Sequence, residues 1–291
     1  MRSISRNRRA CCVLFGMWMT GCVCMGSCGA PLRADIPEGG QASFPLTVSL
    51  PQWGRNVKGC HGTLDSLGRV WSETRHDRVS LFGQGLRMEA ADRARGALYV
   101  IFSPDSARVE LFGPDGERMG LWNRRKLPSG EWSWGEDDDG ADGLRYADGR
   151  WTVSRCGQFI YVQQRGDNEP GLGPWAEVHY EGMLPSEDGS AVTCSLSVRH
   201  RRHSGDGRFQ LRLARRGAGS GADETFVCMG RRNTQRGVPA DANAVVWQLV
   251  PDRGQGFYNF LLVEGGQCLV VLDRNFEKLA TCPDCILKRM E

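Results

Sequence analysis

The chain has 291 residues and a formal net charge of +3, and 40% of its residues are hydrophobic. Four of the 37 basic residues and none of the 34 acidic ones lie before Cys22, which leaves 33 basic against 34 acidic residues after it. That balance argues against a nucleic-acid partner, and no later run approaches the roughly 18 apolar residues of a spanning helix. The part after Gly21 is long enough for two domains with cores of their own.

The first 28 residues have the pattern of a bacterial export signal. Four arginines lie between Arg2 and Arg9, and residues 11–19 form an apolar run that is shorter than the roughly 20 residues needed to cross a bilayer. Residues 19–22, Met-Thr-Gly-Cys, then resemble the lipobox of bacterial lipoproteins. This resemblance implies cleavage after Gly21, acylation of Cys22 and attachment to the lipid bilayer. Cys28 remains the alternative acceptor, and an ordinary signal peptide is the third interpretation.

Residues 22–42 contain Gly, Pro and charged residues without an apolar period, which predicts a lipidated flexible spacer. From residue 43 onward, short apolar runs alternate with turns, and the pair Asp-Gly occurs six times. Such runs indicate strands, and Asp-Gly suits hairpin turns because glycine accepts a positive φ. We therefore predict an all-β fold class with two β-rich domains, at residues 43–165 and 166–291.

Residues 107–153 contain the clearest hairpin pattern, with turns at residues 113–116 and 128–130. Trp132 and Trp134 are two positions apart and therefore share one sheet face. The segment resembles the immunoglobulin-like repeat of flagellar hook-capping proteins. Residues 134–140 stand for its tryptophan-acid-glycine segment and residues 148–153 for its closing strand, although the first acid is missing and the closing Tyr is Trp. The resemblance implies a small β-sandwich used as a spacer or interaction module, with no catalytic residue to carry over.

The second domain is expected to be another β-sandwich or a trefoil-like domain. Residues 149–182 are loosely similar in sequence to residues 207–254. Both a duplication of hairpins and chance remain open as explanations of this similarity. Residues 247–271, with W-x-L, G-x-Y and C-L-x-V, resemble one lobe of a ricin-type β-trefoil lectin. That resemblance implies a glycan-binding module, and the three regular copies of a trefoil are not found.

A basic cluster lies between two alternating apolar runs, which places it at a hairpin tip. It consists of Arg199, His200, Arg201, Arg202 and His203. Such a tip matches lipid phosphates or an acidic glycan, and a solvated turn is the simpler alternative. Because aromatic and arginine side chains tend to dominate binding energy, the other candidate binding residues are the exposed members of Trp175, Trp247 and Tyr258.

Cys282 and Cys285 have the C-x-x-C spacing of redox motifs, but no βαβ pattern surrounds them. We expect a terminal disulfide or unpaired thiols there. For Cys228 and Cys268, a buried thiol and a disulfide both remain open. The acidic residues of segment 136–142 offer oxygen ligands for Ca²⁺, but a solvated turn is the preferred interpretation. The expectation is therefore no metal and no cofactor.

The sequence lacks the serine-hydrolase, zinc-protease and phosphate-loop motifs. We therefore expect a non-catalytic lipoprotein, anchored by Cys22 to the cell membrane or outer membrane and facing the periplasm or the exterior. Its role would be binding or structural, with an envelope protein or a glycan as partner. The first alternative is the trefoil-like lectin, and the second is an envelope hydrolase that uses scattered carboxylates.

Overall fold

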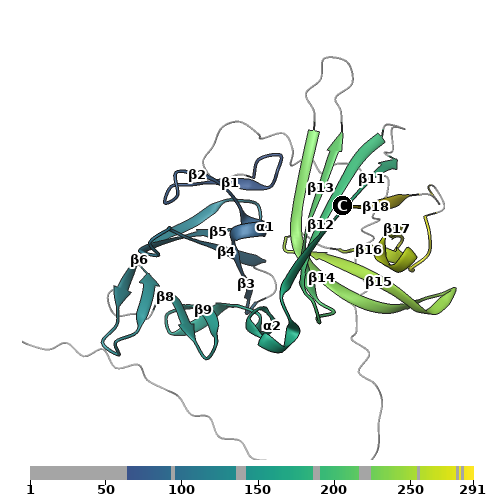
Figure 1. The fold of residues 1–291 in the computed structure, drawn as a ribbon. Helices are drawn as coiled ribbons and strands as arrows, with labels where there is room; N and C mark the ends of the chain where they lie inside the picture. Colours follow the sequence, from purple (N-terminus) through teal and green to yellow (C-terminus); the bar gives the residue numbers. More distant parts are fainter. Residues whose placement is uncertain are drawn as a thin grey trace, which may run out of the picture. The chain divides into compact units, whose positions relative to one another are not determined.

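The computed structural model describes residues 64–92, 96–135, 142–185, 191–215, 224–253, 256–279, 282 and 285–291. They lie within one compact unit that spans residues 44–291. The predicted export signal, Cys22, Cys28 and the predicted spacer lie outside the described residues. The predicted all-β class is confirmed (Figure 1). In the described part of the chain, no helix is long and apolar enough to cross a membrane.

The first half of the described chain forms a closed barrel of eight antiparallel strands, in which neighbours along the chain are neighbours in the sheet. The strands are β3 (Leu86–Ala90), β4 (Ala97–Phe102), β5 (Arg108–Phe112), β6 (Arg118–Lys126), β7 (Trp132–Gly135), β8 (Gly143–Ala147), β9 (Arg150–Arg155) and β10 (Gln158–Val162). β10 closes the barrel by pairing with β3, where Tyr161 lies opposite Ala90. Alternate side chains such as Leu98, Val109 and Leu144 point inward and fill the barrel.

A separate hairpin and a one-turn helix pack on the outer face of this barrel. They are β1 (Arg69–Ser72), β2 (Asp77–Ser80) and α1 (Leu81–Gln84). Their apolar residues, including Val70 and Leu81, form one cluster with Ile101 of β4 and Phe112 of β5. The same cluster includes Met229 from the second half of the chain. The outward side of β4 and β5 is therefore buried as well as the inward side.

Glu110 fastens the hairpin turn to the barrel. Its buried carboxylate accepts hydrogen bonds from the hydroxyls of Ser72 and Thr74, each at 2.6 Å, and from the backbone N–H groups of Glu73 and Thr74. Burial alone would raise the pKa of Glu110, but these hydrogen bonds outweigh it and hold the pKa below its ordinary value.

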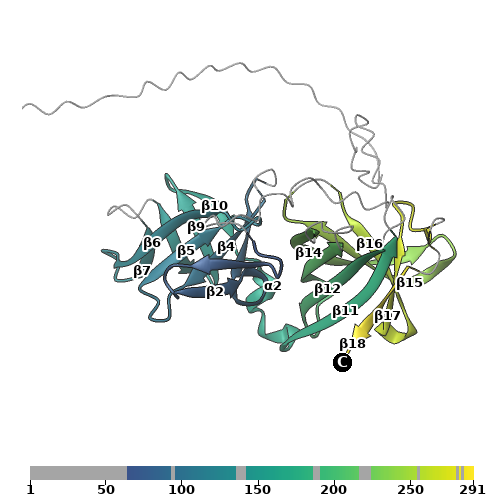
Figure 2. The same cartoon turned by 90° about the horizontal axis from the view of Figure 1, so that it is seen from above.

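The second half of the described chain forms another closed antiparallel barrel with the same sequential order. Its strands are β11 (Trp175–Pro185), β12 (Ala191–Arg201), β13 (Gly207–Arg215), β14 (Glu224–Val238), β15 (Asp241–Pro251), β16 (Tyr258–Val263), β17 (Cys268–Leu272) and β18 (Ile286–Met290), with η4 (Glu264–Gly266) before β17. β18 closes the barrel on β11, and Figure 2 shows β11 beside β12. Its interior is filled by buried apolar side chains, among them Leu196, Phe209 and Leu249.

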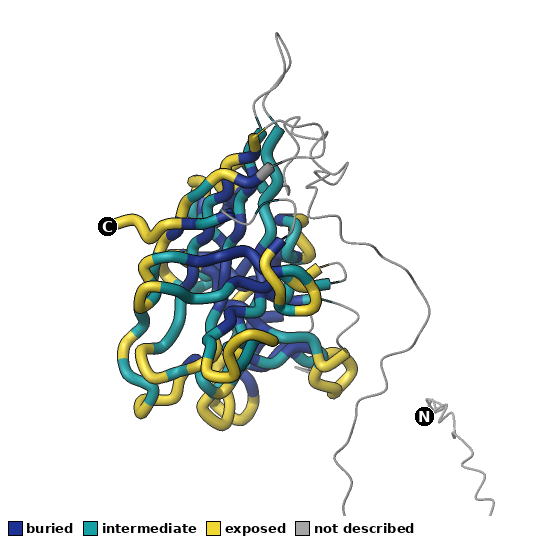
Figure 3. The backbone as a smooth tube through the Cα atoms, turned by 90° about the vertical axis from the view of Figure 1, so that its right-hand side faces the viewer, coloured by how far each residue is buried: buried dark blue, intermediate teal, exposed yellow. Residues whose placement is uncertain are grey.

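The linker between the barrels consists of α2 (Arg165–Asn168) and η3 (Pro170–Leu172). The predicted boundary between residues 165 and 166 lies in this linker, and the division into two domains stays a prediction. Figure 3 shows buried positions along the strands and exposed positions at the turns.

A buried ionic network joins the two barrels. Arg87 of β3 donates from Nε to Asp252, which follows β15, at 2.9 Å, and a second bond joins the same two side chains. The Tyr99 hydroxyl donates to the Asp252 carboxylate at 2.7 Å, and Arg87 also reaches Glu89 at 3.0 Å. Burial would lower the pKa of Arg87, but the negative charge of Asp252 outweighs burial and raises it. Each charge of this network therefore has a partner.

The strand order differs from both predicted architectures. The described part of residues 107–153 forms β5 to β9 of the first barrel, and the described part of residues 247–271 contributes to β15, β16 and β17 of the second. Neither sheet is a sandwich of two separate sheets or a three-lobed trefoil. The correction has a physical reason: a period-two pattern fixes which side of a strand is apolar, whereas closure depends on β10 meeting β3 and β18 meeting β11, pairings between distant residues.

Candidate functional site

A pocket of about 290 Å³ lies where the linker meets the second barrel, and we call it the linker pocket. Its walls come from α2 and η3, from the start of β11 and from the turn between β12 and β13. The lining residues are Gln164, Arg165, Gly166, Asp167, Leu172, Trp175, Arg201, Ser204, Asp206, Gly207 and Arg208.

Strand pairing brings the charged and aromatic side chains of the pocket to one face. Trp175 lies opposite Arg201, and Arg199 lies opposite Arg208. Directly paired residues share a face, and residues two apart do so as well. Because Val198 and Phe209 point into the barrel core, these four side chains lie on the outer face.

Arg201 holds the linker in place. Its Nε donates to the Gly173 carbonyl at 2.5 Å, Nη1 to the Asp167 carbonyl at 2.7 Å and Nη2 to the Glu169 carbonyl at 2.8 Å. Such charge-assisted hydrogen bonds are stronger than neutral ones. Arg201, predicted as a binding residue, therefore builds the pocket wall.

Arg208 is nine-tenths buried and pairs with the Asp167 carboxylate. Its Nε is buried and has no acceptor among the described residues. Burial lowers the pKa of Arg208 in spite of the opposing charge of Asp167. The pocket therefore contains a buried cation with one unsatisfied N–H donor.

Three guanidinium groups surround the half-buried Trp175. The guanidinium carbons of Arg199, Arg208 and Arg201 lie 5.1, 5.4 and 5.7 Å from the ring centroid, within cation–π range. Arg199 also donates from Nη1 to the Gly83 carbonyl of α1 at 2.7 Å, which ties the second barrel to the first. Trp175 is thus held in a fixed position on the pocket wall.

Polar groups of both signs are open at the rim. In the described part of the chain, neither the Asp206 carboxylate nor the Arg165 guanidinium has an ion-pair or hydrogen-bond partner, and both residues are exposed. The Ser204 hydroxyl accepts a hydrogen bond from the Asp206 N–H at 3.1 Å, which shapes the turn. The pocket therefore offers donors and an acceptor together with the apolar surface of Leu172 and Trp175.

The predicted binding residues do not form one surface. Trp175 and Arg201 line the linker pocket, and Arg199 lies beside Trp175. Arg202 and His203 are exposed on the turn, and their backbone N–H groups donate to the Pro174 and Leu172 carbonyls. His200, Trp247 and Tyr258 lie elsewhere, because the alternation of the strands places His200 and Trp247 on the inward side.

The inward side of the second barrel also contains a buried cation. Arg232 lies opposite Gly207 and is 3% exposed. Its guanidinium carbon lies 4.9 Å from the centroid of Trp247, its Nη1 donates to the Thr234 hydroxyl at 3.0 Å, and its Nε has no acceptor among the described residues. Burial lowers the pKa of Arg232 to about 10.

Tyr258 lines a second pocket, of about 230 Å³, with Asn259 on β16, Val271 and Leu272 at the end of β17, and the loop that follows β17. Burial raises the pKa of the Tyr258 hydroxyl. Because this pocket contains only one of the eight predicted binding residues, it does not unite them.

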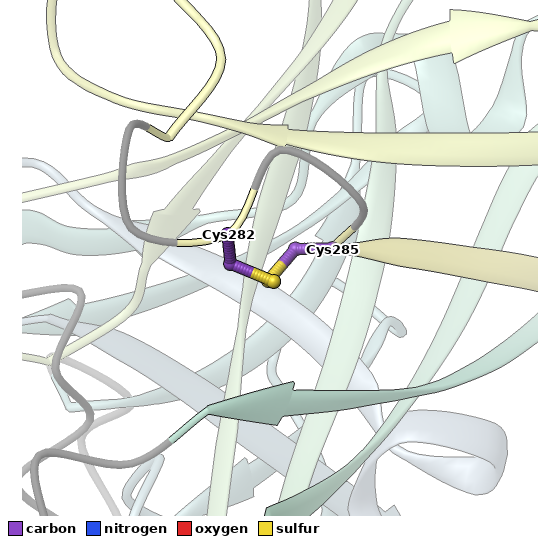
Figure 4. Close-up of a disulfide and its surroundings, with 2 residues drawn as sticks. All are labelled: Cys282 and Cys285. Atoms are coloured by element: carbon purple, nitrogen blue, oxygen red, sulfur yellow. A yellow bond between two sulfur atoms is a disulfide. The ribbon is translucent and has the colours of Figure 1, made fainter. Parts of the chain in front are cut away.

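Cys282 and Cys285 form a disulfide with a Cα–Cα distance of 5.4 Å (Figure 4). Cys194 and Cys228 are free thiols against the same core, and burial raises the pKa of each to about 12. Buried thiols with raised pKa values are poor nucleophiles. Cys268 is also a free thiol.

Most of the acidic segment 136–142 lies outside the described residues. Within the ranges that the structure describes, no group of three or more His, Cys, Asp or Glu side chains is placed to hold a metal ion.

Sequence reasoning missed Arg208, Asp206 and the linker residues of the pocket. Arg208 had a usable signal, since it precedes Phe209, Leu211 and Leu213 in an alternating run and so had to face outward. Nothing local showed that α2 would cover that face. Comparison with family models, with curated proteins and with solved structures finds no match for the chain. The function must therefore be argued from this site.

Proposed function

We propose that the protein is a non-catalytic lipoprotein of the bacterial cell envelope, anchored through acylated Cys22, whose linker pocket binds a small polar ligand. The observation that carries the binding role is that one pocket combines two exposed groups, the Asp206 carboxylate and the Arg165 guanidinium, with the apolar surface of Leu172 and Trp175. In the described part of the chain neither charged group has an ion-pair or hydrogen-bond partner. Ligand pockets typically combine an apolar lining with a few polar groups of this kind.

The arrangement of carboxylates supports binding over the hydrolase alternative. Asp167 and Asp206 are the two carboxylates that line the pocket, and Asp167 is engaged by Arg208. A hydrolase of this type uses two carboxyl groups that flank the scissile bond. Here only Asp206 is open to a ligand.

The anchor is tested by Cys22→Ala, with Cys28→Ala as the matched control. Two acyl signals hold a soluble domain at a membrane because each buried methylene contributes about 0.8 kcal/mol. We expect Cys22→Ala to move the protein out of the membrane fraction and Cys28→Ala to leave it there. Release by Cys28→Ala alone would identify Cys28 as the acceptor, and a membrane fraction unchanged by either variant would contradict the anchor.

The binding role is tested by filling the pocket. A Cβ added at Gly166 lies 3.5 Å from Leu172, so Gly166→Phe places a ring at the pocket lining without a backbone clash. Gly171→Phe is the matched control, because a Cβ at Gly171 has nothing within 4 Å. Neutral sugars, small carboxylates and phosphates are screened by the shift in melting temperature. We expect at least one class to act saturably on the wild type and Gly171→Phe but not on Gly166→Phe. The binding role would be wrong if no class acted, or if Gly166→Phe responded like the wild type.

A further inference from the structure

We infer that the ligand of the linker pocket is a neutral polyhydroxylated ring, the chemical class of a single sugar unit. This inference rests on the proposed binding role of the pocket. The exposed polar groups of the pocket have opposite signs: the Arg165 guanidinium is a donor, and the Asp206 carboxylate is an acceptor.

The opposite charges of these groups argue against a simple ion as the ligand of the linker pocket. An anion would pair with Arg165 but would lie in the same small pocket as the Asp206 carboxylate. A cation would pair with Asp206 but would lie in the same pocket as Arg165 and the buried Arg208. A hydroxyl group both donates and accepts hydrogen bonds, so adjacent hydroxyls on one ring can bond to Arg165 and Asp206 together.

The apolar wall of the linker pocket suits the less polar face of such a ligand. A sugar ring has a face of C–H groups, and Leu172 and Trp175 present apolar surface to the pocket. Trp175 is held by three guanidinium groups at 5.1 to 5.7 Å, so it loses little freedom when a ligand packs on it. A volume of about 290 Å³ lies at the lower end of ligand pockets and suits one ring.

The experiment is isothermal titration of the full mature chain with glucose, galactose, N-acetylglucosamine, glucuronate and inorganic phosphate. The variant is Asp206→Asn, on an exposed turn where only the charge changes. Glu117→Gln is the matched control, because Glu117 is an exposed acid on the β5–β6 turn of the first barrel.

We expect at least one neutral sugar to bind the wild type saturably. Asp206→Asn should weaken that binding by about tenfold or more, because a charge-assisted acceptor is lost. The same variant should strengthen binding of glucuronate, since the repelling carboxylate is removed. Glu117→Gln should change neither.

Binding of phosphate or glucuronate without binding of any neutral sugar would overturn the inference and leave the proposed binding role standing. Neutral-sugar binding that is unchanged in Gly166→Phe would place the sugar elsewhere and would also overturn the inference. No binding by any of the five probes would contradict the sugar assignment, and only the wider screen of solute classes decides the binding role.

Discussion

The two barrels have the same sequential strand order but treat buried charge differently. In the first barrel, Arg87 is paired with Asp252 and Glu89, and Glu110 accepts four hydrogen bonds. In the second, Arg208 and Arg232 are as deeply buried, but each has an Nε without an acceptor among the described residues. The first barrel also has two such Nε atoms, but they belong to Arg125 and Arg145, whose side chains are partly exposed. Among the fully buried charged side chains, those of the first barrel are therefore more completely paired than those of the second.

The largest loss of stability is expected when a paired charge of the buried network between the barrels loses its partner. Asp252→Ala leaves Arg87 buried with only Glu89 nearby, and breaking a buried pair in this way costs about 3 to 5 kcal/mol. Urea unfolding at neutral pH measures the change. The double variant Arg87→Met with Asp252→Leu should recover most of the loss, because an apolar pair has no charge to desolvate. A small loss for Asp252→Ala alone would show that the network does not join the barrels as described.

The second effect concerns the aromatic core of the first barrel. Trp134 is buried and packs edge-on against Phe102 at 5.6 Å and against Trp151 at 5.5 Å. Trp134→Ala should cost about 3 to 5 kcal/mol through lost burial and a cavity. Trp132 has the same orientation but is 50% exposed at the rim, so Trp132→Ala is the matched control and should cost far less. Equal losses in thermal or urea unfolding would contradict this difference in burial.

The two tryptophans also show how far the sequence predicts the fold. Their spacing correctly placed both on one face of a strand, and the short alternating runs correctly indicated an all-β protein. Burial at Trp134 and exposure at Trp132 depend on where the strand ends relative to the barrel, which the local pattern does not contain. Barrel closure was missed for the same reason, because β10 and β3 are separated by most of the first barrel.

The candidate site was predicted only in part. Trp175 and Arg201 were chosen for their chemistry, and the structure places both on the linker pocket. Arg201 is occupied by three backbone carbonyls, which depends on the fold of a linker that has no strand or helix pattern of its own. Sequence reasoning treated the cluster at 199–203 as one tip. Period-two alternation sends Arg199 and His200 to opposite faces.

Glu110 of the first barrel makes the unfolding free energy depend on pH. Its folded-state pKa lies below the ordinary value of 4.5, so its stabilising effect is complete above that value and is lost as pH falls through the folded-state pKa. Glu110→Gln should cost about 2 kcal/mol at pH 7, the typical worth of hydrogen bonds to a charged group. The difference between wild type and variant should shrink as pH falls from 5 to 3. Urea midpoints across that range measure it, and a constant difference would contradict the role of the ionised carboxylate.

The smallest effect is expected at Arg232, where the second barrel has a buried cation without an ion-pair partner in the described part of the chain. Its compensation is one hydrogen bond to Thr234, the face of Trp247 at 4.9 Å and the negative charge of Asp206, which raises the pKa of Arg232 against the effect of burial. A cation–π contact contributes about 0.5 to 2 kcal/mol, which is comparable to the penalty of the unsatisfied Nε.

Arg232→Met keeps much of the side-chain volume and removes the charge, so the unfolding free energy should change by about 1 kcal/mol or less and can increase. Arg236, which is exposed on the same strand, supplies the control Arg236→Met. A loss at Arg232 as large as that of Asp252→Ala would mean that this cation is fully satisfied, and the contrast between the barrels would fail.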